Sequence, residues 1–161
     1  PESTRALTSL LLKVVQEDGT TQEAISYLDE LKIPNPGMDH RIKYEDEGGR
    51  PEAVCYILPK MRQDLWQFGD ALFLDSQKRQ FNTMNWPYIG PCVKDQDMKV
   101  CVVTKSICVE ESTRMYAWVV QMMHEMEPRF SLSQICWIFG YLGITQSLLI
   151  DDVFPNQFVT H

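Results

Sequence analysis

The sequence predicts one mixed α/β domain in which three strands are followed by alternating helix and strand. Residues Phe68 to Asp75 include four consecutive apolar residues, which suit a strand buried on both faces. Residues 110–127 carry an apolar stripe at helical spacing, and a further apolar run follows at residues 134–139. Three sequential strands followed by such an alternation are typical of a mixed sheet covered by helices.

The composition is that of an ordinary globular chain with an acidic balance. The 161 residues, 44% of them hydrophobic, are enough for one domain with a substantial core. The formal net charge of -7 is unfavourable for a general nucleic-acid binder, because such binders gain much of their affinity by neutralising phosphates. A local basic patch remains compatible with this balance.

The cysteines indicate a reducing compartment, either the cytosol or the nucleus. Their number is odd, none forms a CxxC pair, and most lie in apolar surroundings where a free thiol behaves as a small hydrophobic group. The three histidines have no ligand spacing with them, so we expect no zinc site. The chain shows neither a signal peptide nor an apolar run of transmembrane length, so we expect no membrane partner.

Residues 1–37 are predicted to form a helical extension before the main domain. Apolar residues recur at i, i+3, i+4, i+7 and i+8 over residues 4–16, and Thr20 and Glu23 have the spacing of a capping box that opens a second helix. The first residue is not methionine, and the chain ends in the strand-like residues 157–161. We therefore expect a C-terminally truncated domain from a longer protein.

The main domain is predicted to span residues 38–161. It opens with a hairpin, residues 41–44 and 53–58, and continues with a short helix at residues 60–66. From residue 68 the predicted order is β-β-β-α-β-α-β, with the elements at residues 68–75, 80–92, 99–109, 110–127, 134–139, between 143 and 154, and from 157. This is the order of the RNase H-like fold, with helices on the faces of a mixed sheet.

Short motifs between Ile42 and His161 carry a family resemblance. In chain order they are Trp66-Gln67-Phe68-Gly69-Asp70, Asp75, Asn82, Pro87, Tyr88-Ile89-Gly90, Glu111 placed seven residues before Trp118, and Asp152-Val153-Phe154-Pro155-Asn156. Their order and spacing resemble the transposase domain of Mutator-like elements, the MULE family. Far-red-impaired-response plant transcription factors and several animal SWIM zinc-finger proteins share that domain.

The resemblance implies a defective catalytic site. Asp75 matches the first catalytic aspartate, at the end of the first strand of the fold. The second aspartate belongs fourteen residues before Pro155, and Tyr141 stands there. The phenol of tyrosine, with a reference pKa of about 10, is neutral near pH 7 and does not replace a carboxylate as a magnesium ligand. We therefore expect a vestigial Asp75, no bound metal and no enzymatic activity, with Mg²⁺ required only if the chain were active.

Three functions remain open at this point. The first is a domesticated, inactive transposase domain that serves as an interaction or scaffold module for protein partners in a nuclear regulatory protein. The second is an inactive remnant that still binds DNA, and the third is an active metal-dependent transposase or nuclease of the DDE type. The candidate phosphate contacts are the basic residues flanking the Asp75 strand, Lys60, Arg62, Lys78 and Arg79. These four also suit solvated charges at strand ends, and Asp75 also suits a simple strand cap.

Overall fold

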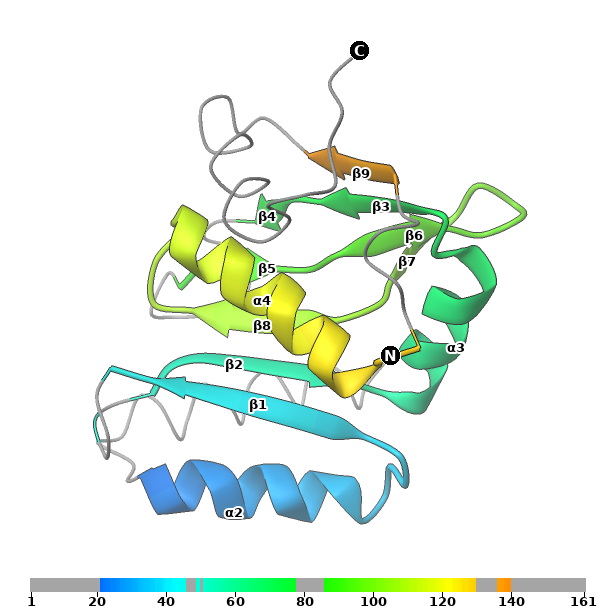
Figure 1. Ribbon diagram of the computed structural model, residues 1–161. Coiled ribbons are helices and arrows are strands. Elements are labelled where there is room, and N and C mark those ends of the chain that lie inside the picture. The colour runs from blue at the N-terminus through cyan, green and yellow to red at the C-terminus, as the bar shows by residue number, and fades with distance from the viewer. Residues whose placement is uncertain (1–20, 46–48, 50, 78–85, 130–135, 140–161) are drawn as a thin grey trace.

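The computed structural model shows a mixed α/β arrangement in which helices cover sheet strands (Figure 1). It describes residues 21–45, 49, 51–77, 86–129 and 136–139. The helices are α2 (Thr21–Lys32), α3 (Pro59–Phe68) and α4 (Thr113–Met126). The strands are β1 (Asp39–Tyr44), β2 (Pro51–Ile57), β3 (Ala71–Leu74), β4 (Ser76–Gln77), β5 (Tyr88–Ile89), β6 (Cys92–Lys94), β7 (Val100–Val102), β8 (Lys105–Cys108) and β9 (Cys136–Phe139).

Within these residues the strands form two sheets. The five-stranded sheet has the order β1-β2-β8-β5-β4, and every neighbouring pair in it is antiparallel. The four-stranded sheet has the order β7-β6-β3-β9. In this second sheet β9 runs parallel to β3, whereas the other pairs are antiparallel. The chain passes through α4 between β8 and β9, as a crossover to a parallel strand requires.

The two sheets continue into one another through shared stretches of chain. Strands β3 and β4, β5 and β6, and β7 and β8 each follow one another after a short kink. At the kinks the Val103 amide donates to the Pro91 carbonyl at 2.9 Å, and the Gly90 amide donates to the Asp75 carbonyl at 3.5 Å. Pro91 has no N–H of its own, so the regular ladder is interrupted at that residue.

A bulge accompanies the kink on the β7–β8 stretch. Ile89 pairs with Ser106, but four residues later Val93 pairs with Cys101 instead of Val102, so one extra residue is accommodated between the two pairs. Val103 and Thr104, adjacent in sequence, are both fully buried, which regular alternation across a pleated strand does not allow. The predicted strands 80–92 and 99–109 are therefore present in part, each as two segments.

Four elements of the described residues agree with the sequence prediction. The second predicted helix corresponds to α2, the predicted hairpin to β1 and β2, and the predicted helix at residues 60–66 to α3. The predicted long helix corresponds to α4, with its N-cap at Ser112. The predicted elements at residues 4–16, between 143 and 154, and from 157 lie outside the described residues.

The predicted start of the Asp75 strand at Phe68 was wrong. Helix α3 runs to Phe68, and the strand begins only at Ala71. The reason is the apolar stripe of α3, in which Phe68 continues the core contacts of Met61 and Leu65 at helical spacing. Nor is β3 fully buried on both faces, because Leu72 and Leu74 are buried whereas the alternate residues are only partly so.

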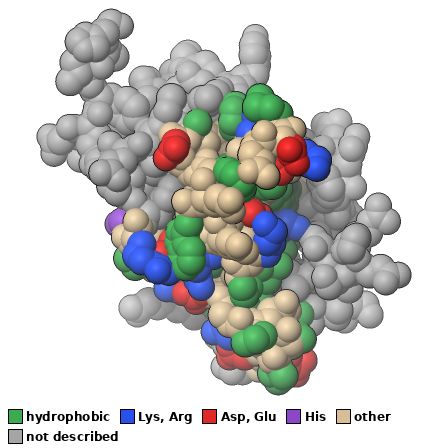
Figure 2. Space-filling view, turned by 90° about the vertical axis from the view of Figure 1, so that its right-hand side faces the viewer, with side chains coloured by type: hydrophobic (Ala, Val, Ile, Leu, Met, Phe, Trp, Pro, Cys, Tyr) green, Lys and Arg blue, Asp and Glu red, His purple; other side chains and the backbone are tan. Residues whose placement is uncertain are grey.

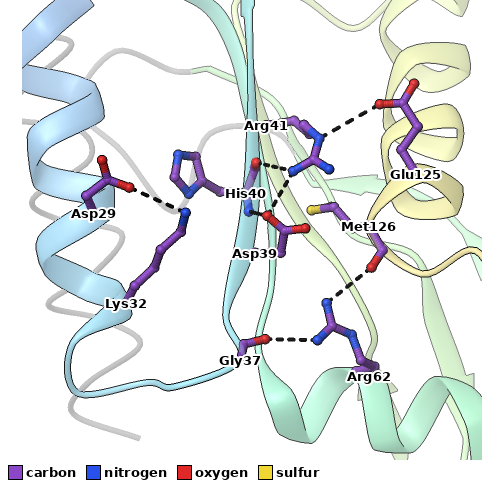
Figure 3. Close-up of polar contacts among 9 residues, drawn as sticks. All are labelled: Asp29, Lys32, Gly37, Asp39, His40, Arg41, Arg62, Glu125 and Met126. Carbon is purple, nitrogen blue, oxygen red and sulfur yellow. Dashed lines mark hydrogen bonds and ion pairs between the residues drawn. The ribbon is translucent and has the colours of Figure 1, made fainter.

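Helix α4 supplies much of the core through a methionine-rich face. It packs against β2 and β1, and its buried apolar residues are Met115, Tyr116, Val119, Val120, Met122, Met123 and Met126. The Ser112 hydroxyl accepts the Met115 N–H at 3.4 Å and so caps its first turn. Helix α2 lies on the opposite side of β1 from α4 (Figure 3), and its Leu28 is fully buried.

The β6–β7 hairpin closes with a strained residue. The Asp95 amide donates to the Lys99 carbonyl at 3.0 Å, the Met98 amide donates to the Asp95 carbonyl at 2.9 Å, and Met98 has a φ of 63°. This geometry matches a three-residue hairpin loop whose last residue is left-handed, where glycine is the favoured residue. A left-handed conformation costs an L-residue on the order of 1–2 kcal/mol, so the hairpin retains Met98 at some expense in stability.

His40 lies between α2 and α4 on strand β1, with its ring directed toward α2 (Figure 3). Burial lowers the pKa of His40 below its ordinary value, and the positive charge of Lys32 lowers it further, although Asp29 and Asp39 act in the opposite direction. Its Nδ1 atom is buried without a hydrogen-bond partner among the described residues. The folded protein therefore favours the neutral imidazole.

We expect His40 to destabilise the fold as the pH falls. Because its pKa is lower in the folded protein than in the unfolded chain, the unfolded chain binds the proton first, and stability is lost below the unfolded value of about 6.5. Urea unfolding of the wild type and of His40→Gln between pH 7.5 and 5.5 measures this. His40→Gln should flatten the loss over that interval, whereas the control His124→Gln should keep it. An unchanged slope in His40→Gln would contradict the assignment.

Candidate functional site

The C-terminal end of β3 gathers polar side chains from two parts of the chain, which we call the β3-end cluster: Asp75, Ser76, Glu111 and Tyr116. The exposed Asp75 accepts the Ser76 N–H through Oδ1 at 2.8 Å. The Ser76 hydroxyl donates to Glu111 Oε1 at 2.5 Å, and the Tyr116 hydroxyl donates to the same oxygen at 3.1 Å. One carboxylate oxygen thus joins the strand end to the start of α4.

Two groups near Asp75, the Tyr116 phenol and the Cys92 thiol, are protonated at neutral pH. Burial raises the pKa of Tyr116, and the negative charges of Glu111 and Asp75 raise it further, whereas the hydrogen bond with Ser76 acts in the opposite direction. Burial also raises the pKa of Cys92 to about 11, with the Asp75 charge contributing. At neutral pH both groups therefore act as hydrogen-bond donors, and Cys92 is a poor nucleophile.

The described part of the β3-end cluster contains two carboxylates, those of Asp75 and Glu111. A two-magnesium site needs several anionic oxygens free to approach the ions in near-octahedral geometry. Glu111 Oε1 is already engaged by two hydroxyl donors. In the part of the chain that the structure describes, no group of three or more His, Cys, Asp or Glu side chains is arranged to hold a metal. Tyr141 lies outside that part.

Lys60 and Arg62 are not brought to the Asp75 end of the strand. Both belong to α3, which precedes β3 and lies at the opposite end of that strand from Asp75 (Figure 1). Lys60 forms an ion pair and hydrogen bond with Asp64, one helical turn further along. The other two candidate phosphate contacts, Lys78 and Arg79, lie outside the described residues.

Arg62 is engaged in contacts that hold the fold together. Its Nη1 donates to the Gly37 carbonyl at 2.9 Å and its Nη2 to the Met126 carbonyl at 3.2 Å (Figure 3). Its Nε lies 3.0 Å from Glu127 Oε2. Arg62 therefore links α3 to the loop before β1 and to the end of α4, and its guanidinium has a structural role that the sequence prediction did not include.

Glu127 is shared by two arginines. Its side chain is only 4% exposed, and its second oxygen lies 3.0 Å from Nε of Arg129. The Arg129 guanidinium in turn stacks on the Trp66 ring, 3.8 Å from the ring centroid. Burying a carboxylate charge this deeply is costly unless nearby cations compensate it. The two arginines provide that compensation.

Sequence reasoning missed most of these partners for a simple reason. Ser76 and Glu111 are 35 positions apart, and Arg62 and Met126 are 64 positions apart, so no local pattern joins them. Glu111 stood out only through its spacing to Trp118. The available signal for Arg62 was its place on a short helix between two apolar residues, Met61 and Leu65, which predicts partial burial.

Comparisons with protein-family models, curated proteins and solved structures give no match to this chain. The resemblance to Mutator-like transposases therefore rests on the order and spacing of its motifs and continues below as a proposal. None of the helices in the described ranges is long and apolar enough to cross a membrane.

Replacing Glu127 by glutamine should destabilise the protein strongly. The substitution leaves Arg62 and Arg129 without their anion, and breaking a buried ion pair costs about 3–5 kcal/mol. Urea unfolding at pH 7 measures the loss. The matched control is Glu125→Gln, because Glu125 is 44% exposed and 3.8 Å from Arg41, where a pair contributes about 1 kcal/mol at most. Equal effects of the two substitutions would contradict this role of Glu127.

Proposed function

We propose that this chain is a domesticated transposase domain that has lost catalysis and serves as an interaction or scaffold module in a nuclear regulatory protein. The observation that carries the proposal is the state of the β3-end cluster. Asp75 directly follows the C-terminal end of β3, and Glu111 nearby is bound by two hydroxyl donors. The resemblance implies that Asp75 is the first catalytic aspartate of the family. The resemblance adds that Tyr141 replaces the second aspartate.

The sheet topology supports an RNase H-like origin. Strands β3, β6 and β7 form an antiparallel meander, and β9 returns beside β3 in parallel after the long helix α4. This agrees with the β-β-β-α-β portion of the predicted order. It also makes β3 an interior strand of the four-stranded sheet, so Asp75 projects from a well-anchored strand end.

The loss of catalysis follows from charge. Two-metal catalysis requires carboxylates that neutralise the ions and hold them close together. A neutral phenol at position 141 supplies no such charge. In the described structure Asp75 Oδ1 accepts a backbone N–H, as an acidic residue does when it caps a strand and opens a turn. This geometry is therefore compatible with an Asp75 that caps the strand and no longer binds a metal ion.

A DNA-binding remnant is a weaker alternative on the described residues. Lys60 is paired with Asp64, and Arg62 is bound to two carbonyls and to Glu127. Groups engaged in this way neutralise few phosphates, and phosphate neutralisation is the main source of non-specific affinity. An active nuclease with an unusual ligand set is the third candidate, and a cleavage assay separates it from the other two.

The full chain, incubated with a labelled DNA duplex in Mg²⁺ or Mn²⁺, should cleave no DNA. Asp75→Asn should behave as the wild type does, because Asp75 has no remaining catalytic task. Gel analysis of the labelled strands over several hours measures both. Cleavage in Mn²⁺ that disappears in Asp75→Asn would instead establish the active-nuclease alternative. In the parent protein, Asp75→Ala should likewise leave the regulatory activity intact.

A further inference from the structure

Lys105 differs from the other lysines of the described residues because its charge has no partner. In that part of the chain its side chain forms no ion pair, hydrogen bond or ring contact, although it is half-buried. Each of the others faces a carboxylate or an aromatic ring: Lys32 with Asp29, Lys43 with Glu52, Lys60 with Asp64, Lys99 with Asp97, and Lys94 over Phe73. Figure 2 shows the commoner arrangement on one side of the molecule, where several lysine and arginine side chains lie next to carboxylates.

The strand register places Lys105 in a row of polar residues that crosses three strands. Tyr56 of β2 lies directly opposite Lys105 of β8, and His40 of β1 lies directly opposite Tyr56 on the other side of β2. Residues that are directly opposite in an antiparallel pair share one face of the sheet. The His40 ring is directed toward α2 (Figure 3), so Lys105 belongs to the face of the sheet on that side. We call His40, Tyr56 and Lys105 the polar row.

An apolar row adjoins the polar row on the same face. Ile42, Val54 and Ile107 stand two positions further along β1, β2 and β8 and are paired in register. Val54 is 4% exposed and Ile107 is 7% exposed, while Tyr56 in the polar row is only 2% exposed. A phenol is neutral near pH 7. The neighbours of Lys105 in these two rows therefore reduce its contact with water without offering it a negative charge.

This environment makes the Lys105 amine more nucleophilic than the amines of the paired lysines. Burial lowers the pKa of Lys105 below its ordinary value, because the ammonium ion loses water without gaining an anion. Lys60 shows the opposite behaviour, since its hydrogen bond with Asp64 raises the pKa of its amine. A lower pKa leaves more of an amine in the neutral form at a given pH, and the neutral amine is the nucleophile.

We propose that Lys105 is a modification site, at which the amine of the polar row accepts a small acyl group from a thioester donor. The amine attacks the thioester carbonyl and the carbon–sulfur bond breaks. The thiolate leaves with the electron pair and takes up the proton that the nitrogen loses. The products are an amide at Lys105 and a free thiol. This inference goes beyond the proposed function and does not depend on it, because the polar row shares no residue with the β3-end cluster.

The surroundings of Lys105 favour an acyl group over other electrophiles that react with amines. An aldehyde would give an imine, which takes up a proton and becomes a cation, and carbon dioxide would give a carbamate anion. An amide carries no charge. Where the described neighbours supply no countercharge, a neutral product is the one that partial burial stabilises relative to the starting ammonium ion.

Acetylation of the full chain by S-acetyl-N-acetylcysteamine, a small uncharged thioester, tests the proposal. Peptide mass spectrometry measures the initial rate of acetylation at each lysine at pH 7.5. Lys105 should be acetylated at least about threefold faster than Lys60 and Lys99, because more of its amine is neutral. Lys60 and Lys99 are internal controls, since both are exposed and paired with carboxylates. The same reaction in urea, where the unfolded chain exposes every lysine, should remove the difference.

A rate at Lys105 equal to or below the rates at Lys60 and Lys99 would overturn the proposal. So would a difference that persists in urea, because it would then come from the local sequence and not from the fold. Lys105→Arg keeps the positive charge but has no amine to acylate, so its intact mass should lack the rapidly added acetyl group. Rapid acetylation that continues undiminished in Lys105→Arg would assign the reaction to another residue and overturn the proposal as well.

Lys105→Gln provides a second test through the folding equilibrium. Because the pKa of Lys105 is lower in the folded protein than in the unfolded chain, its charged form destabilises the fold at neutral pH. Glutamine carries a neutral amide, as acylated lysine does, so Lys105→Gln should raise the urea midpoint of unfolding. The control Lys99→Gln should leave the midpoint unchanged, because the Lys99 side chain is 74% exposed. A midpoint for Lys105→Gln no higher than that for Lys99→Gln would overturn the proposal.

Discussion

Much of the described structure depends on the ion pairs that the buried Glu127 carboxylate forms with two arginines. A charge at this depth requires cations, and Arg62 and Arg129 supply them from α3 and from the residues after α4. Arg62 also binds the Gly37 carbonyl, so the same cluster fixes the loop between α2 and β1. Arg129 then stacks on Trp66. The ion pairs of Glu127 therefore help to hold α3 against the end of α4 and the loop before β1, in addition to the core packing of Met61 and Leu65.

The second constraint is the kink shared by three adjacent strand stretches. Because Pro91 offers no N–H, and because an extra residue must be accommodated near Val103 and Thr104, the ladder changes direction at this level of the sheet. Asp75 lies at the same level, where its carbonyl accepts the Gly90 amide. The kink thus turns the chain after β3 and presents Asp75 and Ser76 to Glu111 at the start of α4.

Local patterns in the sequence predicted the elements well where one signal dominated. Three local patterns each predicted one type of element: a capping box before a helix, a polar loop within a hairpin, and an apolar stripe on a long helix. The structure contains all three elements, as α2, the β1–β2 hairpin and α4. The boundary at Phe68 failed because the same apolar residue suits the end of a helix and the start of a strand. Only its packing with Met61 and Leu65 decides between them.

The candidate site was harder to predict than the fold, since its contacts join distant parts of the chain. Lys60 and Arg62 were grouped with Asp75 because they precede the same strand, but their position on α3 puts them at its other end. For Arg62 the decisive partner, Glu127, lies 65 positions away. Sequence adjacency gives the charge of a neighbourhood and not the direction in which a guanidinium points.

The two ends of β3 are held by different groups of residues. At its C-terminal end, Asp75 caps the strand, and Glu111 nearby accepts hydrogen bonds from the Ser76 and Tyr116 hydroxyls. At its N-terminal end, Arg62 of α3 binds the Gly37 and Met126 carbonyls and the buried Glu127, so polar contacts of the fold fix this end. None of these residues belongs to the β3-end cluster. The loss of catalysis that we propose therefore concerns the C-terminal end of β3 and leaves the contacts that hold α3 in place unchanged.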